Sequence, residues 1–414
     1  MARRGDSCGV SPMSEPIADT LHRPDPATAG LAVSPLRGRR DLCAWLDLPA
    51  RLQGDDPHWV APLRHEQKRL LSRRSNPFFR RGDAEFFLAR RGRRTVGRIS
   101  AHTALPMTGL DPTKVGTFGF FECEDDPAAA RALLQAAEGW LARRGARSLL
   151  GPINFTLNQE CGLLVEGFDS PPFLLMGHNP PRYARLLEGC GYRKLRDLYA
   201  WKYTVGAMPP ELPRLAARVG RTSGVRIRVL DRARFEEDAR TILRIFNEAW
   251  KDNWGFSPMH PDEFSEAIRD LRRIVDPELV LLAEKADRVI AIAVSLPNLN
   301  EALAGLRGRL LPFGLLRLLW RLKVRRPKTA RCLMLGIEAA ERGFSSFGLS
   351  VLLYVAMSEA AQRRGVQWGE LSWTLEDNVA INKGIEATGA VRYKTYRIYS
   401  KEIRGQNDRA EVDA

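Results

Sequence analysis

One succession of elements occurs twice in this chain, in segments that lie about 200 residues apart. Near the C-terminus an apolar strand ends at Asn378, a helix follows, Gly389 closes the helix, and a strand rich in Tyr and basic residues comes next. In the first half Asn179 precedes a helix, Gly191 closes it, and a similar strand ends at Trp201. Because a repeat of this length corresponds to a whole domain, we expect two copies of one fold.

The other predicted elements follow the same order in both halves. Each half has an apolar hairpin, a strand, an amphipathic helix, a strand, a second helix and a final strand. The elements before the repeated ending are a hairpin at 86–101, a strand at 115–123, a helix at 128–144 and a strand at 148–153, then a strand at 225–230, a helix at 235–250, a hairpin at 279–296, a strand at 332–338 and a helix at 349–363. This order predicts an α/β protein with two tandem domains, each a mixed central sheet flanked by helices.

The length of 414 residues has room for two to three domains, and the repeat reduces this to two. The predicted organisation is a disordered lead at 1–35, an N-terminal domain at 36–205, a linker at 206–222, a C-terminal domain at 223–403 with an insertion at 301–330, and a disordered tail at 404–414. The lead lacks the apolar core of a signal peptide. Because no stretch reaches about 18 consecutive apolar residues, we expect no segment to span a bilayer. Cys residues without disulfide-like spacing favour a reducing compartment, so a cytoplasmic protein is expected.

The composition is that of a globular protein with a strong positive charge. Its net charge of +15 favours an anionic partner such as acidic lipid, CoA phosphates or nucleic acid. Nucleic acid is not expected, because the sequence has no helix-turn-helix or zinc-finger spacing. The six Cys show no disulfide-like spacing and the six His no metal-ligand pattern, so no metal is expected.

A long segment at 151–181 interrupts the repeated order in the first half. It mixes amides with aromatic residues, and long structured insertions are commonly functional. Asn154, Asn158 and Asn179 are therefore candidates for binding hydroxyl or amide groups of a substrate. The alternative is that these three amides satisfy the backbone of their own loop, which is the commoner use of Asn.

The insertion at 301–330 has the composition of an amphipathic, basic helix. Arg317, Arg321 and Arg325 share one face at four-residue spacing, and Leu side chains occupy the other. This pattern is typical of a helix that lies in a membrane interface, so 310–326 is expected to bind an anionic membrane surface peripherally. The alternative is an amphipathic helix that covers the domain's own sheet.

The strand that ends at Asn378, with the helix after it, resembles the last third of the GNAT acyltransferase fold. In that family the Asn and the helix flank the pantetheine arm of acyl-CoA, and a Gly-rich turn binds the pyrophosphate at a helix N-terminus. The matching turn begins with Arg342 and Gly343, but Ser345 and Phe347 replace the next two glycines. The resemblance therefore implies a donor site at Arg342, Gly343, Ser345 and Asn378, with acyl-CoA as co-substrate and no permanently bound cofactor. An ordinary strand-to-helix turn is the alternative.

The same resemblance implies candidates for the proton chemistry. Glu338 ends the fourth strand, where some family members place a catalytic Glu, and Glu376 lies at the mouth of the next strand. Tyr393 is a third candidate, although Tyr in such a strand more often belongs to the core. A helix-capping role is the alternative for Glu376. The family's acid Tyr is replaced by Ile385, a survivable loss since a thiolate with a pKa near 8.5 is a good leaving group.

Over roughly residues 40 to 403 the chain is similar to a bacterial family of two-domain GNAT-like proteins that includes ceramide synthases. The matching runs are 56–63, 76–79, 151–154, 371–378 and 393–399. This resemblance implies an acyl-CoA-dependent N-acyltransferase acting on a lipid amine, a sphingoid base. Two other readings stay open: a non-catalytic lipid-binding or scaffold protein, and an N-acetyltransferase acting on a small amine.

Overall fold

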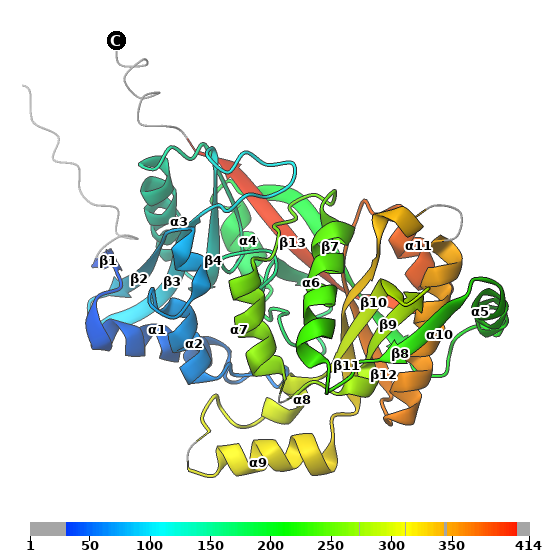
Figure 1. The fold of residues 1–414 in the computed structure, drawn as a ribbon. Helices are drawn as coiled ribbons and strands as arrows, with labels where there is room; N and C mark the ends of the chain where they lie inside the picture. The colour runs from blue at the N-terminus through cyan, green and yellow to red at the C-terminus, as the bar shows by residue number, and fades with distance from the viewer. Residues whose placement is uncertain (1–29, 273, 311, 343–345, 404–414) are drawn as a thin grey trace, which may run out of the picture.

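The computed structural model describes residues 30–272, 274–310, 312–342 and 346–403. In this part of the chain, strands from both halves form one mixed, 13-stranded sheet covered by helices on its two faces (Figure 1). Along the sheet the order is β1-β2-β3-β4-β5-β13-β7-β12-β11-β10-β9-β8, and β6 pairs with β13 beside this path. The first half thus occupies one end of the sheet and the second half the other.

The elements of the first half follow the predicted order. They are β1 (Leu31–Pro35), α1 (Gly38–Gln53), α2 (Arg64–Leu71), a 3-10 helix (Pro77–Arg80), β2 (Ala84–Arg91), β3 (Arg94–Thr103), β4 (Val115–Cys123), α3 (Pro127–Ala142), β5 (Ser148–Gly151), β6 (Leu163–Glu166), α4 (Arg182–Glu188) and β7 (Arg193–Thr204). Asp126 caps α3, because its carboxylate accepts hydrogen bonds from the backbone N–H groups of Ala128 and Ala129.

The second half repeats this order with two additional helices between its third and fourth strands. Its elements are α5 (Glu211–Thr222), β8 (Val225–Val229), α6 (Phe235–Trp250), α7 (Pro261–Leu271), a 3-10 helix (Pro277–Leu279), β9 (Val280–Lys285), β10 (Arg288–Pro297), α8 (Leu299–Leu303), α9 (Gly314–Trp320) continued by a π-helix (Arg321–Arg325), β11 (Thr329–Ile337), a 3-10 helix (Ala339–Glu341), α10 (Ser346–Arg363), β12 (Trp368–Leu375), α11 (Val379–Ala387) and β13 (Val391–Glu402). In Figure 1, α9 lies at the lower edge of the molecule, outside the layers that cover the sheet.

The last strands of the two halves are exchanged. β7, which ends the first half, pairs with β12 of the second half, and β13 pairs with β5 and β6 of the first half. β7 and β13 also pair with each other, antiparallel, over most of their length. The expectation of two separate sheets was therefore wrong. β7 and β13 have similar apolar and aromatic patterns, so either strand could pair with the same neighbouring strand. The sequence pattern alone therefore does not determine whether each strand pairs within its own half or with the other half.

Apolar side chains alternate between the two faces of the sheet. In the first half Phe87 packs under α3, whereas the neighbouring Phe86 packs against Trp45 of α1. In the second half Leu281 packs under α10, whereas Leu282 packs under α6. Since each fully buried side chain of this size contributes about 1.5–3 kcal/mol, both helical layers are needed to stabilise the sheet.

Two details differ from the organisation expected at the boundaries. Residues 31–35, assigned to the disordered lead, form β1 and pair with β2. Much of the expected linker is α5, whose Ala216 packs against Val351 and Val355 of α10. The tail at 404–414 and most of the lead lie outside the described residues. A five-residue strand is too short to be detected by periodicity alone. In α5 the helical pattern over 212–219 is apparent in the sequence, but Pro213 and Gly220 favour a linker there.

Candidate functional site

The two central parallel strands of the second half diverge. Parallel pairing between β11 and β12 ends at Cys332 and Leu371, although β11 continues to Ile337 and β12 to Leu375. Beyond that point the facing edges no longer pair with each other. Unpaired backbone N–H and C=O groups at such edges are available to an amide-containing ligand.

A narrow pocket, with a cavity volume of about 50 Å³ and partly open to solvent, lies beside the last paired residues of these strands. It is enclosed by β7, β11, β12 and α10, and both Cys332 and Leu371 contribute to its wall. Most of the lining is apolar, including Val205, Met208, Met357, Ala360 and Val366. An apolar pocket next to diverging strands suits a hydrocarbon chain attached to a polar group.

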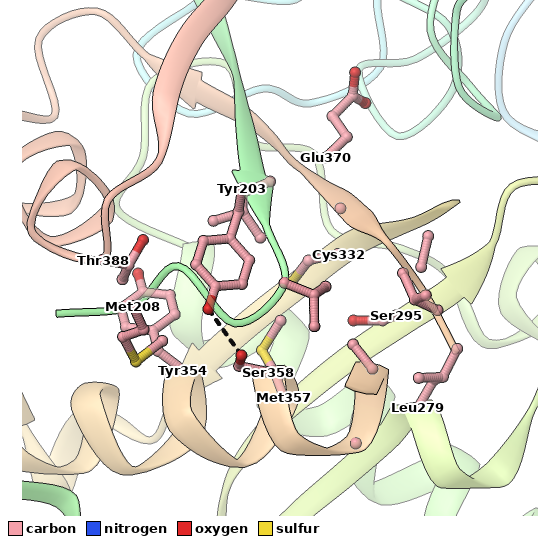
Figure 2. A pocket seen from close by; sticks show the side chains of 17 residues that line it. Tyr203, Met208, Leu279, Ser295, Cys332, Tyr354, Met357, Ser358, Glu370 and Thr388 are labelled. Atoms are coloured by element: carbon pink, nitrogen blue, oxygen red, sulfur yellow. Dashed lines mark hydrogen bonds between the residues drawn. The ribbon is translucent and has the colours of Figure 1, made fainter. Parts of the chain in front are cut away.

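One polar pair interrupts the apolar lining. The hydroxyl groups of Tyr203 on β7 and Ser358 on α10 are joined by a hydrogen bond of 2.8 Å (Figure 2). In the same view the carboxylate of Glu370 points away from this pair, although Glu370 belongs to a pocket-lining strand. The pocket therefore has an apolar interior, and the charge of Glu370 lies on the other side of β12.

On that side Glu370 is the centre of a buried group of polar residues, here called the central polar cluster: Arg331, Glu370, Ser372 and Tyr393. Glu370 is fully buried, and its carboxylate accepts hydrogen bonds from the hydroxyl groups of Ser372, at 2.5 Å, and Tyr393. The guanidinium of Arg331 donates to Ser372 at 2.9 Å and lies 3.4 Å from Glu370. Removing one partner of such a buried ion pair costs about 3–5 kcal/mol, so the cluster fixes how β11, β12 and β13 fit together.

The loop at 151–181 covers the central polar cluster. Arg331 also donates to the carbonyl oxygen of Leu174, and the ammonium of Lys394 donates to the carbonyl oxygens of Gly167 and Ser170, each at 2.7 Å.

Burial lowers the pKa of Lys394 to about 8, although nearby carboxylates, Glu370 first, oppose this shift. Burial and the adjacent Glu370 raise the pKa of Tyr393. Its hydroxyl therefore stays protonated and donates a hydrogen bond to the carboxylate of Glu370.

A histidine and an aspartate pair at the edge of the same loop. The Nε2 atom of His178 lies 2.8 Å from a carboxylate oxygen of Asp56, whose other oxygen accepts a hydrogen bond from the backbone N–H of His58. The side chain of His178 is only 2% exposed, and its Nδ1 atom is buried without a protein partner. Burial lowers the pKa of His178, and the bond to Asp56 partly compensates. The imidazole is therefore neutral near pH 7.

Two of the predicted catalytic carboxylates are paired with basic residues. Glu338 is fully buried, and its two oxygens accept hydrogen bonds from Arg244 and Arg288. Although burial acts to raise the pKa of Glu338, these two guanidinium groups lower it overall. Glu376 accepts hydrogen bonds from the Lys194 ammonium, at 2.6 Å, and from a backbone N–H. Each oxygen of these two carboxylates therefore accepts a hydrogen bond from a charged side chain or from a backbone N–H.

The residues predicted for the donor site lie around the diverging ends of β11 and β12. Arg342 donates to the carbonyl oxygens of Ile337 and Ala249, which holds the turn after β11 against α6. Asn378 caps α11, because its side chain accepts a hydrogen bond from a backbone N–H in the first turn. Gly343 and Ser345 lie outside the described residues.

The three candidate amides of the loop at 151–181 all bind backbone groups. Asn154 accepts from the N–H of Phe120 at 2.8 Å, and Asn158 donates to the carbonyl oxygen of Ser257 at 3.0 Å. Asn179 accepts from the N–H of Leu164 and donates back to its carbonyl oxygen. Only Asn179 binds the backbone of its own loop, and it thereby positions the adjacent His178. Asn154 and Asn158 instead tie the loop to β4 and to the segment after α6.

The structure thus brings few of the predicted site residues together. Of the three predicted catalytic residues, Tyr393 belongs to the central polar cluster, whereas Glu338 and Glu376 each lie in separate ion pairs. Glu370 was missed, although a Glu inside an otherwise apolar strand was a usable signal. Asp56 lies in the run 56–63 and His178 in the segment 151–181. The two residues are 122 positions apart, and no feature of a single sequence indicates that they are in contact.

The insertion presents a row of exposed apolar side chains. Phe313, Leu316, Trp320 and Val324 are each at least 53% exposed. Arg321, by contrast, faces the protein and donates to the carbonyl oxygens of Ala302 and Ala304. Among the described residues, no helix is both long and apolar enough to cross a membrane, and no group of side chains has the composition of a metal site.

Comparison with known proteins identifies close relatives along nearly the whole chain, although no family model matches it. The chain is 40% identical to a bacterial ceramide synthase from Caulobacter vibrioides over 388 residues, which cover 92% of this chain and 99% of that protein. It is 39% identical to Protein YghO from Escherichia coli over 369 residues, which cover 88% of this chain and 94% of that protein.

Solved structures with the same fold include N-acetyltransferases of the GNAT class. A tandem GNAT protein from the clavulanic acid biosynthesis pathway has a TM-score of 0.53 at 15% identity and covers 90% of this chain and 99% of its own. A GCN5-related N-acetyltransferase from Sphaerobacter thermophilus has a TM-score of 0.51 at 16% identity, with 90% and 96% covered. These neighbours confirm the tandem GNAT fold, and the sequence identities give the relationship: this chain belongs to the two-domain GNAT family that includes bacterial ceramide synthase.

Proposed function

We propose that this protein is an acyl-CoA-dependent N-acyltransferase whose acceptor is a long-chain amino alcohol, a sphingoid base. The observation that carries the proposal is the apolar pocket beside the diverging strands β11 and β12, in a chain 40% identical to a ceramide synthase. A small-amine acetyltransferase has no need of such a pocket. Because each buried CH₂ group contributes about 0.8 kcal/mol, the pocket favours long acyl chains over acetyl.

The donor is proposed to bind as a substrate and to leave as CoA. Its pantetheine amides would pair with the free edges of β11 and β12 near Asn378, and its acyl chain would enter the pocket lined by Met208 and Met357. The turn at Arg342, Gly343 and Ser345 remains our proposal for the phosphate site. Free N–H groups at the start of α10 would supply the anion-binding groups there.

In the reaction the amine nitrogen of the acceptor attacks the thioester carbonyl carbon. A C–N bond forms, the C–S bond breaks, and one proton leaves the nitrogen while the CoA sulfur accepts one. The thiolate leaves readily, since its pKa is near 8.5. The proton acceptor for the amine is therefore the main catalytic group that the protein must provide. Tyr393, as a donor to Glu370, is proposed to maintain the strand geometry beside the reacting carbonyl.

We also propose that the insertion binds an anionic membrane surface, at the cytoplasmic side of the inner membrane. The apolar row of Phe313, Leu316, Trp320 and Val324 supports this proposal, as do the exposed Arg317, Lys323 and Arg325 beside it. Apolar burial and attraction to acidic headgroups would act together, the second by about 1 kcal/mol for each basic residue near the surface. Both lipid substrates would then reach the site without crossing water.

The test is incubation of the purified protein with long-chain acyl-CoA or acetyl-CoA and with a sphingoid base or a small polyamine. Mass spectrometry is expected to detect the long-chain amide of the sphingoid base. Acetylation of the small amine alone would support the acetyltransferase reading, and acyl-CoA binding without product would support the scaffold reading. Ala361→Leu, which narrows the pocket, is expected to shift the preference to shorter acyl chains, whereas Ala217→Leu on the exposed face of α5 is the matched control.

A further inference from the structure

The pairing of Asp56 with His178 determines which imidazole nitrogen carries the hydrogen. An ionised carboxylate only accepts hydrogen bonds, and the contact of 2.8 Å joins Asp56 to Nε2. The hydrogen therefore resides on Nε2. In the neutral imidazole this leaves Nδ1 with a free lone pair.

The orientation of the His178 imidazole is fixed by its neighbours, although its Nδ1 atom has no hydrogen-bond partner in the protein. Asp56 is itself fixed by the N–H of His58 at 2.8 Å, and His178 precedes Asn179, whose amide is bound on both sides to the backbone of Leu164. No protein donor reaches Nδ1, although the atom is buried. A buried acceptor without a partner costs about 1–3 kcal/mol, so such a site is expected to have a use.

Burial keeps His178 neutral, and the charged groups around it connect it with the central polar cluster. Asp56, Lys394 and His58 are the groups that act on its charge, and burial outweighs the favourable effect of Asp56. Lys394 in turn lies within electrostatic range of both Asp56 and Glu370. His178, which belongs to the loop that covers the central polar cluster, thus lies within electrostatic range of Lys394 on β13.

We propose that His178 accepts the proton from the acceptor amine, with Asp56 as its positioning residue; this inference rests on the proposed function. The amine nitrogen forms its bond to the thioester carbon and gives a proton to Nδ1. His178 then carries a positive charge that Asp56 stabilises, and it returns the proton to the leaving CoA sulfur. Atoms and charges balance without any other reactant. The donor chain lies on one side of β12, and the acceptor approaches from the other.

The test compares His178→Gln, His178→Ala and Asp56→Asn with His65→Gln on α2, whose side chain is 65% exposed, as the matched control. Loss of a general base is expected to lower kcat/KM of the two His178 variants by about 10²- to 10⁴-fold. The wild type is expected to lose activity as the pH falls through the pKa of His178. This acid limb is expected to be absent in His178→Gln and to move to lower pH in Asp56→Asn, because the imidazolium loses its counter-charge.

Adding imidazole to His178→Ala distinguishes a catalytic role of His178 from a purely structural one, because free imidazole can replace a missing base but cannot repair a structural defect. Partial recovery of turnover with imidazole supports the inference. Wild-type kcat/KM in a folded His178→Gln, or an unchanged acid limb in Asp56→Asn, would overturn it while leaving the acyltransferase function intact. If the wild type itself forms no amide, the proposed function fails and the inference fails with it. Should His178→Gln not fold, Asp56→Asn and its pH profile decide.

Discussion

The indole N–H of Trp201 donates a hydrogen bond of 2.9 Å to the hydroxyl oxygen of Thr374, although the two residues lie 173 positions apart in different halves. Trp201 belongs to β7 and Thr374 to β12, so this bond crosses the junction made by the exchanged strands. The two repeats therefore share one hydrogen-bonded sheet. Neither half retains all of its strand partners when the other is absent.

The first prediction concerns this dependence. A protease site inserted after the exposed Gly206, between β7 and α5, is expected to be cleaved without separating the halves. β7 and β13 hold the fragments together through backbone hydrogen bonds. The two fragments are expected to elute as one species in size-exclusion chromatography and to separate only in denaturant. Elution as two native fragments would show that the halves fold independently.

The second prediction concerns Glu338. Because Arg244 and Arg288 each donate to one oxygen of its carboxylate, Glu338→Gln is expected to lower the free energy of unfolding by about 1–3 kcal/mol. The Gln amide is uncharged and has only one oxygen that can accept from these two guanidinium groups. Turnover is expected to change less than tenfold. Denaturant unfolding and kcat measured on the same preparation check both. A 10²- to 10⁴-fold loss of kcat with unchanged stability would instead restore Glu338 as the general base.

The third prediction is a pH dependence of stability that originates at Glu160. Burial first, and then the neighbouring Glu122, raise the pKa of Glu160 from 4.5 to about 7, against the attraction of Arg98. Between these two values the folded state binds more protons than the unfolded state, so this carboxyl makes stability fall as pH rises from 4.5 to 7.

Glu160→Gln removes that titration. The variant is therefore expected to lose less stability than the wild type between pH 5 and pH 8, by up to about 3 kcal/mol. The measurement is chemical denaturation at both pH values. Glu66→Gln on α2 serves as the control, and equal pH dependence of Glu160→Gln and the wild type would contradict the prediction.

The fourth prediction separates the exposed apolar row from the arginines of the insertion. Replacing Phe313, Leu316 and Trp320 by Ser is expected to weaken binding to anionic vesicles by at least tenfold, because this surface loses its apolar burial. Arg317→Glu with Arg325→Glu is expected to weaken binding as well, and only at low salt. Sedimentation with vesicles of acidic and of neutral lipid measures both effects.

Arg321 is excluded from the charge-reversal pair because it holds α9 to α8 through two carbonyl oxygens. Its replacement is expected to loosen the insertion and not merely to change its charge. Wild-type vesicle binding by the triple Ser variant would show that the insertion serves another surface. Circular dichroism of each variant confirms that the fold is retained.

Local sequence patterns determined most of the elements of this protein. The helix predicted at 235–250 and the strand predicted at 115–123 have the same bounds in the structure, and the repeated ending of the two halves is present as predicted. Periodicity of 3.6 or 2 residues depends on neighbours within one element, so a single sequence reports it directly. The acidic cap at Asp126 is equally local.

Only the tertiary structure decided which distant residues meet. The exchange of β7 and β13, the pairing of Asp56 with His178 and the hydrogen bond from Tyr393 to Glu370 join residues 23 to about 250 positions apart. The inward turn of Arg321 likewise depends on carbonyl oxygens of another helix. Such contacts are selected by packing, by burial of charge and by the satisfaction of buried polar groups across the whole fold, and a local pattern holds no record of them.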